Sequence, residues 1–521
     1  MNYNAIMKML NFFKINDSYR SAKTSLFFVI LAGFLSYNLL VVYRVADPDT
    51  IIEGLTYYIN ATWAIVGCGR WMLPIVNILS GNVIMPYFVV FFYCFCMWLC
   101  AFLIAKIWRV DNTLFLTIAA VSMTVTPAAI SQLVATYMGE CFALACLFSV
   151  LFVYFCFESS SILSWLFSTA CIVFSLALYQ SYISMSACLV LMTLCIYCLK
   201  CEEIKTIVQK GIKSVITALA GGILYVLSNK IVLGILKLES SSRLAEFSIG
   251  RIFQNLPSQI VEMYRVYFSY FNDPVLLRKL FYALLLVVFV VSSICSLIKQ
   301  KQKLLIVAVF VLCVVLIPLA ANLIGIATPD NPITVLMTYQ NILVVPFTLA
   351  VSMESSLNIR LDSVKRTSAA ILSVIILWTH MISANATYEC YKMSHDHVYN
   401  QYSQLVYDVQ HYDGYIKNET PVLIAGFFDD KTLRNNIKTY RYAVDLFDDL
   451  VFWDTLGGAT YNRHRYVLQY FGLDFIDFSI DEYKRIINTD EFKEMSRWPE
   501  QNGMRMIDGY LVIKIADNYA R

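Results

Sequence analysis

The sequence predicts an α-helical polytopic membrane protein with about eleven transmembrane helices and a small extracytoplasmic α/β C-terminal domain. Of its 521 residues, 59% are hydrophobic and 15% are charged, and the mean hydropathy is +0.62. A soluble chain is closer to about half apolar and about a quarter charged. Apolar runs of about 20 residues, the length that a bilayer core requires, recur as far as residue 385. Beyond them the composition becomes soluble, so we predict two domains, 1–385 and 386–521.

The apolar runs give the positions of the predicted spans. They lie near residues 24–45, 83–105, 113–130, 140–157, 162–179, 182–199, 213–235, 279–298, 304–325, 336–354 and 367–385. We expect the first to be a retained span, because it is too long for a signal-peptide core and no small-residue cleavage site follows it.

The distribution of lysine and arginine predicts the orientation of these spans. Basic residues gather in the links at 200–213, 299–303 and 360–366, which fall on the same side as the basic N-terminus. The positive-inside rule assigns that side to the cytoplasm. The first outer loop at 46–82, the second at 236–278 and the C-terminal domain are therefore expected on the extracytoplasmic side of the membrane.

Regular patterns predict further elements outside the spans. In the second outer loop, apolar residues from Ile249 to Leu256 recur at helical spacing, which favours an amphipathic helix at the membrane interface. In the C-terminal domain, Pro421–Phe428 and Tyr510–Ile515 read as buried strands, and Asp481–Asn488 reads as a helix.

Two aspartates, Asp47 and Asp49, directly follow the first span and are the candidate catalytic residues. A carboxylate at the outer membrane edge can take a proton from a hydroxyl group as that hydroxyl attacks a carbon centre. Asp47 is the slightly preferred base because it lies closer to the end of the span. The alternative is a helix start, in which Asp47 is an N-cap before Pro48 and Thr50 forms a capping box with Glu53. The two interpretations are compatible.

Arginines and tryptophans in the outer loops are candidate ligand-binding residues. Arg70, with Arg251, could bind a phosphate, because a guanidinium stays charged and donates two hydrogen bonds at once. The alternative is that these arginines only reach lipid headgroups. Trp63 and Trp71 could stack on sugar rings, although tryptophan is also the usual residue of the membrane interface.

Polar residues at the outer ends of spans point to a cavity on that side. Glu140 opens the fourth span, and Tyr179 and Gln180 close the fifth. Such side chains cost free energy in a bilayer, so they favour a functional site. No set of residues has metal-ligand spacing, so we expect neither a metal nor another cofactor. The net charge of +3 gives no reason to expect nucleic acid, and the chain lacks a Walker loop and a dinucleotide fingerprint.

Taken together, these residues resemble the Gtr-type (type II) bacterial glucosyltransferases. The likeness rests on an acidic pair after the first span, Asp47 and Asp49, followed by Trp63 and the pair Gly69-Arg70. It implies the GT-C architecture, in which the first outer loop of a multi-span enzyme carries the catalytic carboxylate. It also implies transfer of a hexose, glucose in that family, from a polyprenyl-phosphate carrier to a surface polysaccharide such as O-antigen or a wall glycan. The aspartates are separated by a proline here, which leaves the base open between them.

The resulting hypothesis is an inverting, metal-independent hexosyltransferase of the bacterial cytoplasmic membrane. Asp47 or Asp49 would deprotonate the acceptor, and Arg70 with Arg251 would hold the donor phosphate. The sugar and acceptor would contact the remaining candidates, which are Trp63, Trp71, Glu140, Tyr179 and Gln180. The outer C-terminal domain would help to receive the acceptor chain, and a donor synthase and a flippase would be functional partners.

Two alternatives remain, and the second of them, a polysaccharide polymerase, could use the same outer loop. A transporter or flippase for a lipid-linked saccharide predicts repeated halves and polar residues near the bilayer midplane. The sequence has no internal repeat and no deep charged pair. A polysaccharide polymerase is a neighbouring enzyme class.

Overall fold

In this computed structural model the chain is described over most of its length. The described residues are 18–43, 65–81, 83–159, 161–200, 202–240, 249–272, 275–299, 303–327, 333–354, 359–426, 428, 468, 471–473 and 479–517. They form two compact units. The first contains most of the helices up to Ala384. The second contains the chain from Asn385 onward, with the small sheet, and also two short segments from earlier in the chain.

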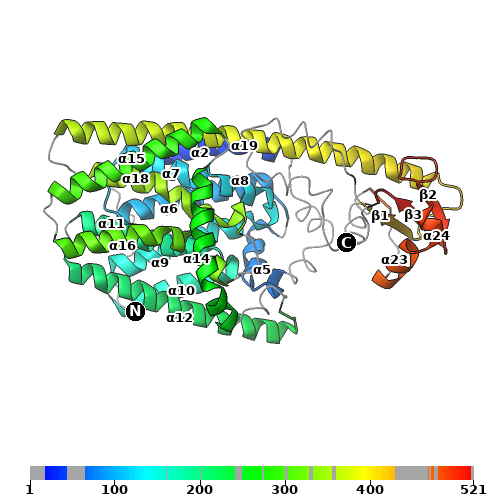
Figure 1. Cartoon of the computed structure of the whole chain (residues 1–521), viewed down its shortest axis with the longest axis horizontal. Helices are drawn as coiled ribbons and strands as arrows, with labels where there is room; N and C mark the ends of the chain where they lie inside the picture. Colours follow the sequence, from blue (N-terminus) through cyan, green and yellow to red (C-terminus); the bar gives the residue numbers. More distant parts are fainter. Residues whose placement is uncertain are drawn as a thin grey trace. The chain divides into compact units, whose positions relative to one another are not determined.

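The first unit is a bundle of long apolar helices that run side by side (Figure 1). In chain order they are α2 (Ser18–Val42), α6 (Pro86–Ile107), α7 (Thr113–Thr124), α8 (Pro127–Val134), α9 (Gly139–Glu158), α10 (Ile162–Leu178), α11 (Tyr182–Leu199), α12 (Ile204–Leu236), α15 (Leu276–Lys299), α16 (Leu304–Ala321), α18 (Val344–Met353) and the first part of α19 (Ile359–Gln410). Each predicted span overlaps one of these helices or a pair of them.

The helices differ in whether they are long enough to cross the hydrocarbon core of a bilayer. Among the described residues, eight are long and apolar enough to cross a membrane. The pair α7 and α8 adds a ninth that is bent by 45°. The bend follows from Pro127, because the residue before a proline is pushed out of the helical region. Two shorter apolar helices, Ile162–Leu178 and Tyr339–Met353, account for the remaining predicted spans. The polytopic helical fold is therefore confirmed.

Burial shows which helices are central and which are peripheral. In α11, 83% of the apolar window is buried, whereas in α12 the share is 11%. The buried residues of α12 form a narrow stripe at a spacing of four, which is the face that a helix presents to one neighbour. In its middle the stripe consists of Lys213, Thr217, Gly221 and Tyr225. The rest of α12 is apolar and exposed, as expected of a helix in contact with lipid.

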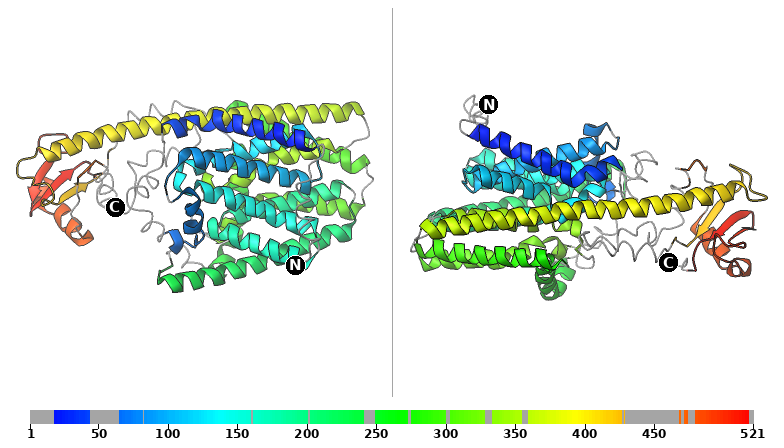
Figure 2. Two further views of the ribbon diagram at one scale, coloured as in Figure 1. Left: turned by 180° about the vertical axis from the view of Figure 1, so that it is seen from behind. Right: turned by 90° about the horizontal axis from the view of Figure 1, so that it is seen from above.

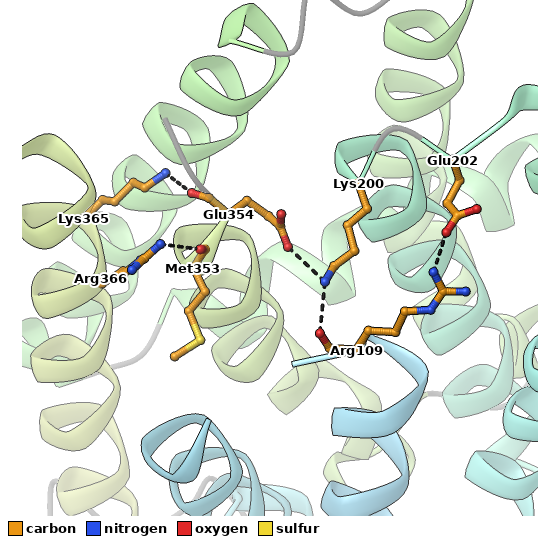
Figure 3. Close-up of polar contacts among 7 residues, drawn as sticks. All are labelled: Arg109, Lys200, Glu202, Met353, Glu354, Lys365 and Arg366. Atoms are coloured by element: carbon orange, nitrogen blue, oxygen red, sulfur yellow. Dashed lines mark hydrogen bonds and ion pairs between the residues drawn. The ribbon is translucent and has the colours of Figure 1, made fainter. Parts of the chain in front are cut away.

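Charged residues gather at one end of the bundle (Figure 3). Lys200, at the end of α11, lies 3.4 Å from the Glu354 carboxylate and donates to the Arg109 carbonyl at 3.1 Å. Lys365 and Arg366 donate to the carbonyls of Glu354 and Met353, where α18 ends. Cations stabilise a helix C-terminus because they meet its unpaired carbonyl groups. We call this region the basic end; the links at 200 and 360–366 both lie there.

Helix α14 (Ile249–Phe271) runs across the long helices rather than along them (Figure 1). It is attached to α16 by two hydrogen bonds. The Asn322 side-chain amide donates to the Met263 carbonyl at 2.8 Å, and the Tyr264 hydroxyl donates to the Val315 carbonyl at 2.7 Å. The predicted amphipathic helix in the second outer loop is therefore confirmed as a helix, with Arg251 in its first turn.

The second unit is built on a three-stranded sheet with the order β1-β3-β2. Strand β1 (Val422–Ala425) pairs in parallel with β3 (Tyr510–Lys514), and β2 (Met504–Ile507) pairs antiparallel with β3. Two apolar cores cover its faces. One contains Leu405 and Val409 of α19, and the other contains residues of α23 (Ile480–Ile487) and α24 (Asp490–Lys493). Burial on both faces explains the unbroken apolar runs that predicted the strands.

Candidate functional site

The candidate site lies at the end of the bundle opposite the basic end, where Figures 1 and 2 show the short helix α5 (Leu73–Val76). Residues 65–72 form a tight turn that precedes α5. Gly69 has a φ of 86°, a backbone conformation that glycine adopts without strain. The turn is tied to α10 because the Met72 amide donates to the Ala177 carbonyl at 3.2 Å. The turn therefore explains why a glycine directly precedes Arg70.

Two side chains hold the carbonyl groups of this turn. The Gln180 side-chain amide donates to the Cys68 carbonyl at 2.8 Å and to the Tyr225 hydroxyl oxygen at 2.9 Å. The Tyr225 hydroxyl donates to the Gly69 carbonyl at 3.2 Å. We call Gln180 and Tyr225 the clamp. It fixes the backbone that immediately precedes Arg70.

Arg70 is a partly buried cation with few polar partners. Its guanidinium carbon lies 4.7 Å from the centroid of the Tyr179 ring, and Nη1 donates to the Met138 sulfur at 3.4 Å. Its Nε is buried and has no hydrogen-bond partner among the residues that the structure describes. Among the described residues, Arg70 forms no ion pair. A guanidinium held this way has donors left for an anion, and a phosphate accepts them two at a time.

Three more side chains near this turn carry buried polar atoms that have no partner within the described part of the chain. They are the indole nitrogen of Trp71, both amide atoms of Asn77 and Oε1 of Glu140. Asn77 is 1% exposed and Glu140 is 2% exposed. An unpaired buried polar group costs about 1–3 kcal/mol, so proteins rarely keep several together without a reason. The arrangement fits a ligand that has many hydrogen-bonding groups.

Aromatic rings connect the turn to the interior of the bundle. The Tyr179 ring contacts that of Tyr182, with centroids 6.1 Å apart, and Tyr182 contacts Tyr339 at 5.7 Å. The Tyr182 hydroxyl donates to the Gln132 side chain at 3.0 Å, and the Gln132 amide donates to the Leu336 carbonyl at 2.9 Å. The link before α18 is therefore joined to the same end of the bundle as Arg70.

Five of the predicted site residues lie among the described residues on the elements that meet at this end of the bundle. They are Arg70, Trp71, Glu140, Tyr179 and Gln180. The predicted catalytic pair Asp47 and Asp49 lies outside the described residues, as does Trp63. The side chain of Arg251 lies outside the described side chains. The roles assigned to all nine residues stay predictions.

Sequence reasoning missed Tyr225, Asn77 and Arg278. Tyr225 belongs to a stripe of polar and small residues on the apolar helix α12, and such a stripe is visible in the sequence. Asn77 is a polar residue inside the apolar segment 72–79, and a polar residue buried in such a segment is costly. Arg278 is a charged residue near the start of an apolar run.

Arg278 is 3% exposed and connects α15 to α19. Its Nε donates to the Thr379 hydroxyl at 3.1 Å, and Nη2 donates to the Thr379 carbonyl at 3.1 Å and to the Ser383 hydroxyl. Nearby, the Tyr282 hydroxyl lies 3.0 Å from Nε2 of His380. Because its donors are used within the bundle, we interpret Arg278 as a structural residue.

Comparison with known proteins identifies one family. The model of the family described as Glucosyl transferase GtrII matches residues 49–345, more than half of the chain. The matched range includes Arg70, Asn77, Glu140 and the clamp. No curated protein and no solved structure matches the chain.

Proposed function

This chain belongs to the GtrII glucosyl transferase family, and we propose that it moves a glucosyl group from a polyprenyl-phosphate carrier to a cell-surface polysaccharide such as O-antigen. The transfer inverts the anomeric centre and takes place on the outer face of a bacterial cytoplasmic membrane. Membership of the family supports glycosyltransferase activity in general, and the helical bundle supports a location in a membrane. The donor, the acceptor and the side of the membrane belong to the proposal.

One observation supports a sugar phosphate as the donor. Arg70 offers hydrogen-bond donors to an anion, and the neighbouring Trp71, Asn77 and Glu140 have buried polar atoms without partners. A sugar attached to a phosphate combines the anion with a ring of hydroxyl groups. Its lipid chain suits the apolar surface that surrounds the bundle, where α12 is largely exposed.

The proposed reaction is a single displacement at the anomeric carbon. Asp47 or Asp49 takes the proton from an acceptor hydroxyl, and the hydroxyl oxygen forms a bond to the anomeric carbon. The bond from that carbon to the phosphate oxygen breaks, and its electron pair leaves with the phosphate. Arg70, with Arg251, stabilises the negative charge that develops there. In this scheme the arginines supply the positive charge, so no metal ion is required.

The other elements have supporting roles in the proposal. Tyr179, Gln180 and Trp71 shape the sugar pocket, with Trp63 from the first outer loop. The second unit helps to receive the acceptor chain. A synthase that makes the polyprenyl-phosphate hexose and a flippase that brings it to the outer face supply the donor.

Transfer by the purified full-length protein in proteoliposomes tests this proposal. The donor is radiolabelled polyprenyl-phosphate glucose, and the product is labelled polysaccharide. We expect Arg70→Ala to lower kcat about 100-fold or more, as loss of a preorganised charge donor does. Arg109→Ala is the matched control, because Arg109 pairs with Glu202 at the basic end; its activity should match the wild type.

Replacing the two aspartates separately tests the base. We expect Asp47→Asn or Asp49→Asn to abolish transfer while leaving donor binding intact. Full activity in both variants rules out the acid assignment. Movement of the labelled donor across the bilayer without transfer would instead identify a flippase.

A further inference from the structure

Asn77 is a buried polar residue whose side chain has a more specific use than recognition of a sugar phosphate in general. It begins the short helix η2 (Asn77–Ser80) and is 1% exposed. Among the described residues, neither its amide nitrogen nor its amide oxygen has a hydrogen-bond partner. Asn112 shows how a structural asparagine is used in the same chain, since its side chain accepts the Phe115 amide at 3.0 Å at the start of α7.

Glu140 and Asn77 lie on two elements that pack against each other. Asn77 directly follows α5, Glu140 lies in the first turn of α9, and α5 packs against α9. The Ser80 hydroxyl donates to the Asn77 backbone carbonyl at 3.0 Å, which leaves the Asn77 side chain out of this bond. Ser80 is 4% exposed and Glu140 is 2% exposed. No described residue forms a hydrogen bond with Oε1 of Glu140. The unpaired amide of Asn77 and the unpaired carboxylate oxygen of Glu140 are therefore both buried, on two elements that pack against each other.

The chemistry of this pair identifies the ligand class. An amide donates and accepts hydrogen bonds, and a carboxylate accepts them. Neighbouring hydroxyl groups of a pyranose both donate and accept, so they satisfy all of the unpaired atoms. A lipid chain satisfies none of them. A phosphate is repelled by the carboxylate and is better placed at Arg70.

We propose that Asn77 and Glu140 form a subsite that holds hydroxyl groups of the transferred hexose and determines which hexose the enzyme accepts. The inference rests on the proposed function, because it concerns the sugar of the same donor. A site built to bind a hydroxyl group rejects analogues that cannot make the bond, since its polar atoms are then left unpaired.

The test compares Asn77→Leu with the wild type in two measurements. The first is the thermal midpoint of the full-length protein in detergent without substrate. Because the Asn77 amide has no partner, we expect an apolar side chain of similar size to leave the midpoint unchanged or to raise it. The second is kcat/KM for polyprenyl-phosphate glucose against the galactose and mannose donors. We expect the preference for the favoured hexose to fall at least about tenfold.

Two further variants complete the experiment. Glu140→Gln keeps the shape and one acceptor, so we expect a smaller loss of preference than in Asn77→Leu. Asn112→Leu is the matched control, because it removes a paired asparagine at the basic end. It should lower the thermal midpoint and leave the preference among hexoses unchanged.

The outcomes separate this inference from the proposed function. If the wild type transfers one hexose selectively and Asn77→Leu keeps the same selectivity, the subsite is wrong and the proposed function stands. A thermal midpoint lowered as much as in Asn112→Leu, with selectivity kept, also overturns the subsite. If the wild type transfers no hexose from any of the three donors, both proposals fail.

Discussion

The direction in which Arg70 points is fixed by bonds to the two carbonyl groups that precede it. The clamp holds the carbonyls of Cys68 and Gly69, so the backbone cannot turn without breaking hydrogen bonds. The Tyr179 ring then supports the guanidinium from one side. Preorganisation of this kind matters because a charge that is already in place needs no reorganisation when the reaction occurs.

Removing the hydroxyl of Tyr225 tests the clamp. Tyr225→Phe leaves the Gly69 carbonyl and one N–H of Gln180 without their partners. We expect kcat to fall about 10- to 100-fold, because small displacements of a charged group at a reacting centre cost about that much. The measurement is transfer per folded molecule, with kcat and the donor KM determined separately. Tyr87→Phe is the control, since Tyr87 is 70% exposed. An unchanged kcat in Tyr225→Phe would contradict a positioning role.

At the scale of residues, sequence predicts which side chains are costly but not where they point. Arg70, Glu140 and Gln180 stand out because polar groups at span ends need a reason to be there. Tyr225 does not stand out, because a tyrosine is acceptable both in lipid and in a site. Its role depends on the neighbour that α12 meets, and this is a property of packing between helices far apart in the chain.

Helix α12 contributes to the site through close packing on α10. Gly221 lies on its buried stripe, four residues before Tyr225. A Cβ atom on Gly221 would overlap the Ile172 side chain and meet the Thr169 carbonyl. Small residues allow helices in membranes to approach closely, which brings Tyr225 within reach of the turn.

Two adjacent glycines of α12 give a matched pair of variants. Gly221→Ala should lower the stability of the protein by about 1–3 kcal/mol, because the added methyl group has no room. Gly222→Ala should be neutral or stabilising, since nothing lies within 4 Å of a Cβ at that position. Thermal midpoints of both proteins in detergent check this. Equal midpoints would show that α10 and α12 do not pack closely at Gly221.

The start of α23 predicts a pH dependence in the second unit. The pKa of Glu482 is lowered to about 2, first by the hydrogen bond from the Ser479 backbone amide and then by that from the Tyr510 hydroxyl. Because this pKa is lowered, the ionised carboxylate stabilises the fold fully at any pH above the ordinary carboxyl pKa of 4.5. This stabilisation is lost as the pH falls from about 4.5 towards about 2.

Hydrogen exchange of α23 in the full-length protein measures this effect. After correction for intrinsic rates, we expect protection of its first turn to decrease as the pH is lowered through that range. Glu482→Gln should remove most of this pH dependence. Glu491→Gln, at an exposed position in α24, should leave it unchanged. Identical pH profiles for wild type and Glu482→Gln would contradict the assignment.

At the scale of elements, hydropathy predicted the helices and strands but not their exact shapes. The span at 113–130 is broken by Pro127, and the last span extends far beyond 385 as part of α19. Hydropathy detects the part of a helix that lies in lipid. It does not detect where a helix continues as a polar segment outside lipid, because that part is stabilised by packing against other elements and not by its mean hydropathy.

The number of membrane crossings predicts on which side of the membrane each end of the helical bundle's chain lies. Among the described residues, eight long helices, one bent pair and two shorter apolar helices give eleven candidate crossings. The prediction of eleven crossings, an odd number, is that the start of α2 and the end of the last span face opposite sides of the membrane. From the positive-inside rule we predict that the basic end and the start of α2 face the cytoplasm.

Reporter fusions check this arrangement. Alkaline phosphatase fused after residue 521 should be active, and a green fluorescent protein at the same position should be dark, because the C-terminal unit is expected outside. Fusions in the link after Lys200 should behave in the opposite way. The same reporter response at both positions would contradict the proposed topology and with it the location of the site.

A donor-bound structure of the full-length protein tests the central claim most directly. With polyprenyl-phosphate glucose bound, we expect phosphate oxygens about 3 Å from the Arg70 guanidinium. Hexose hydroxyl groups should contact Asn77 and Glu140, and Asp47 or Asp49 should lie on the opposite face of the anomeric carbon. A phosphate bound elsewhere, with Arg70 still stacked on Tyr179 and free of the donor, would contradict the account.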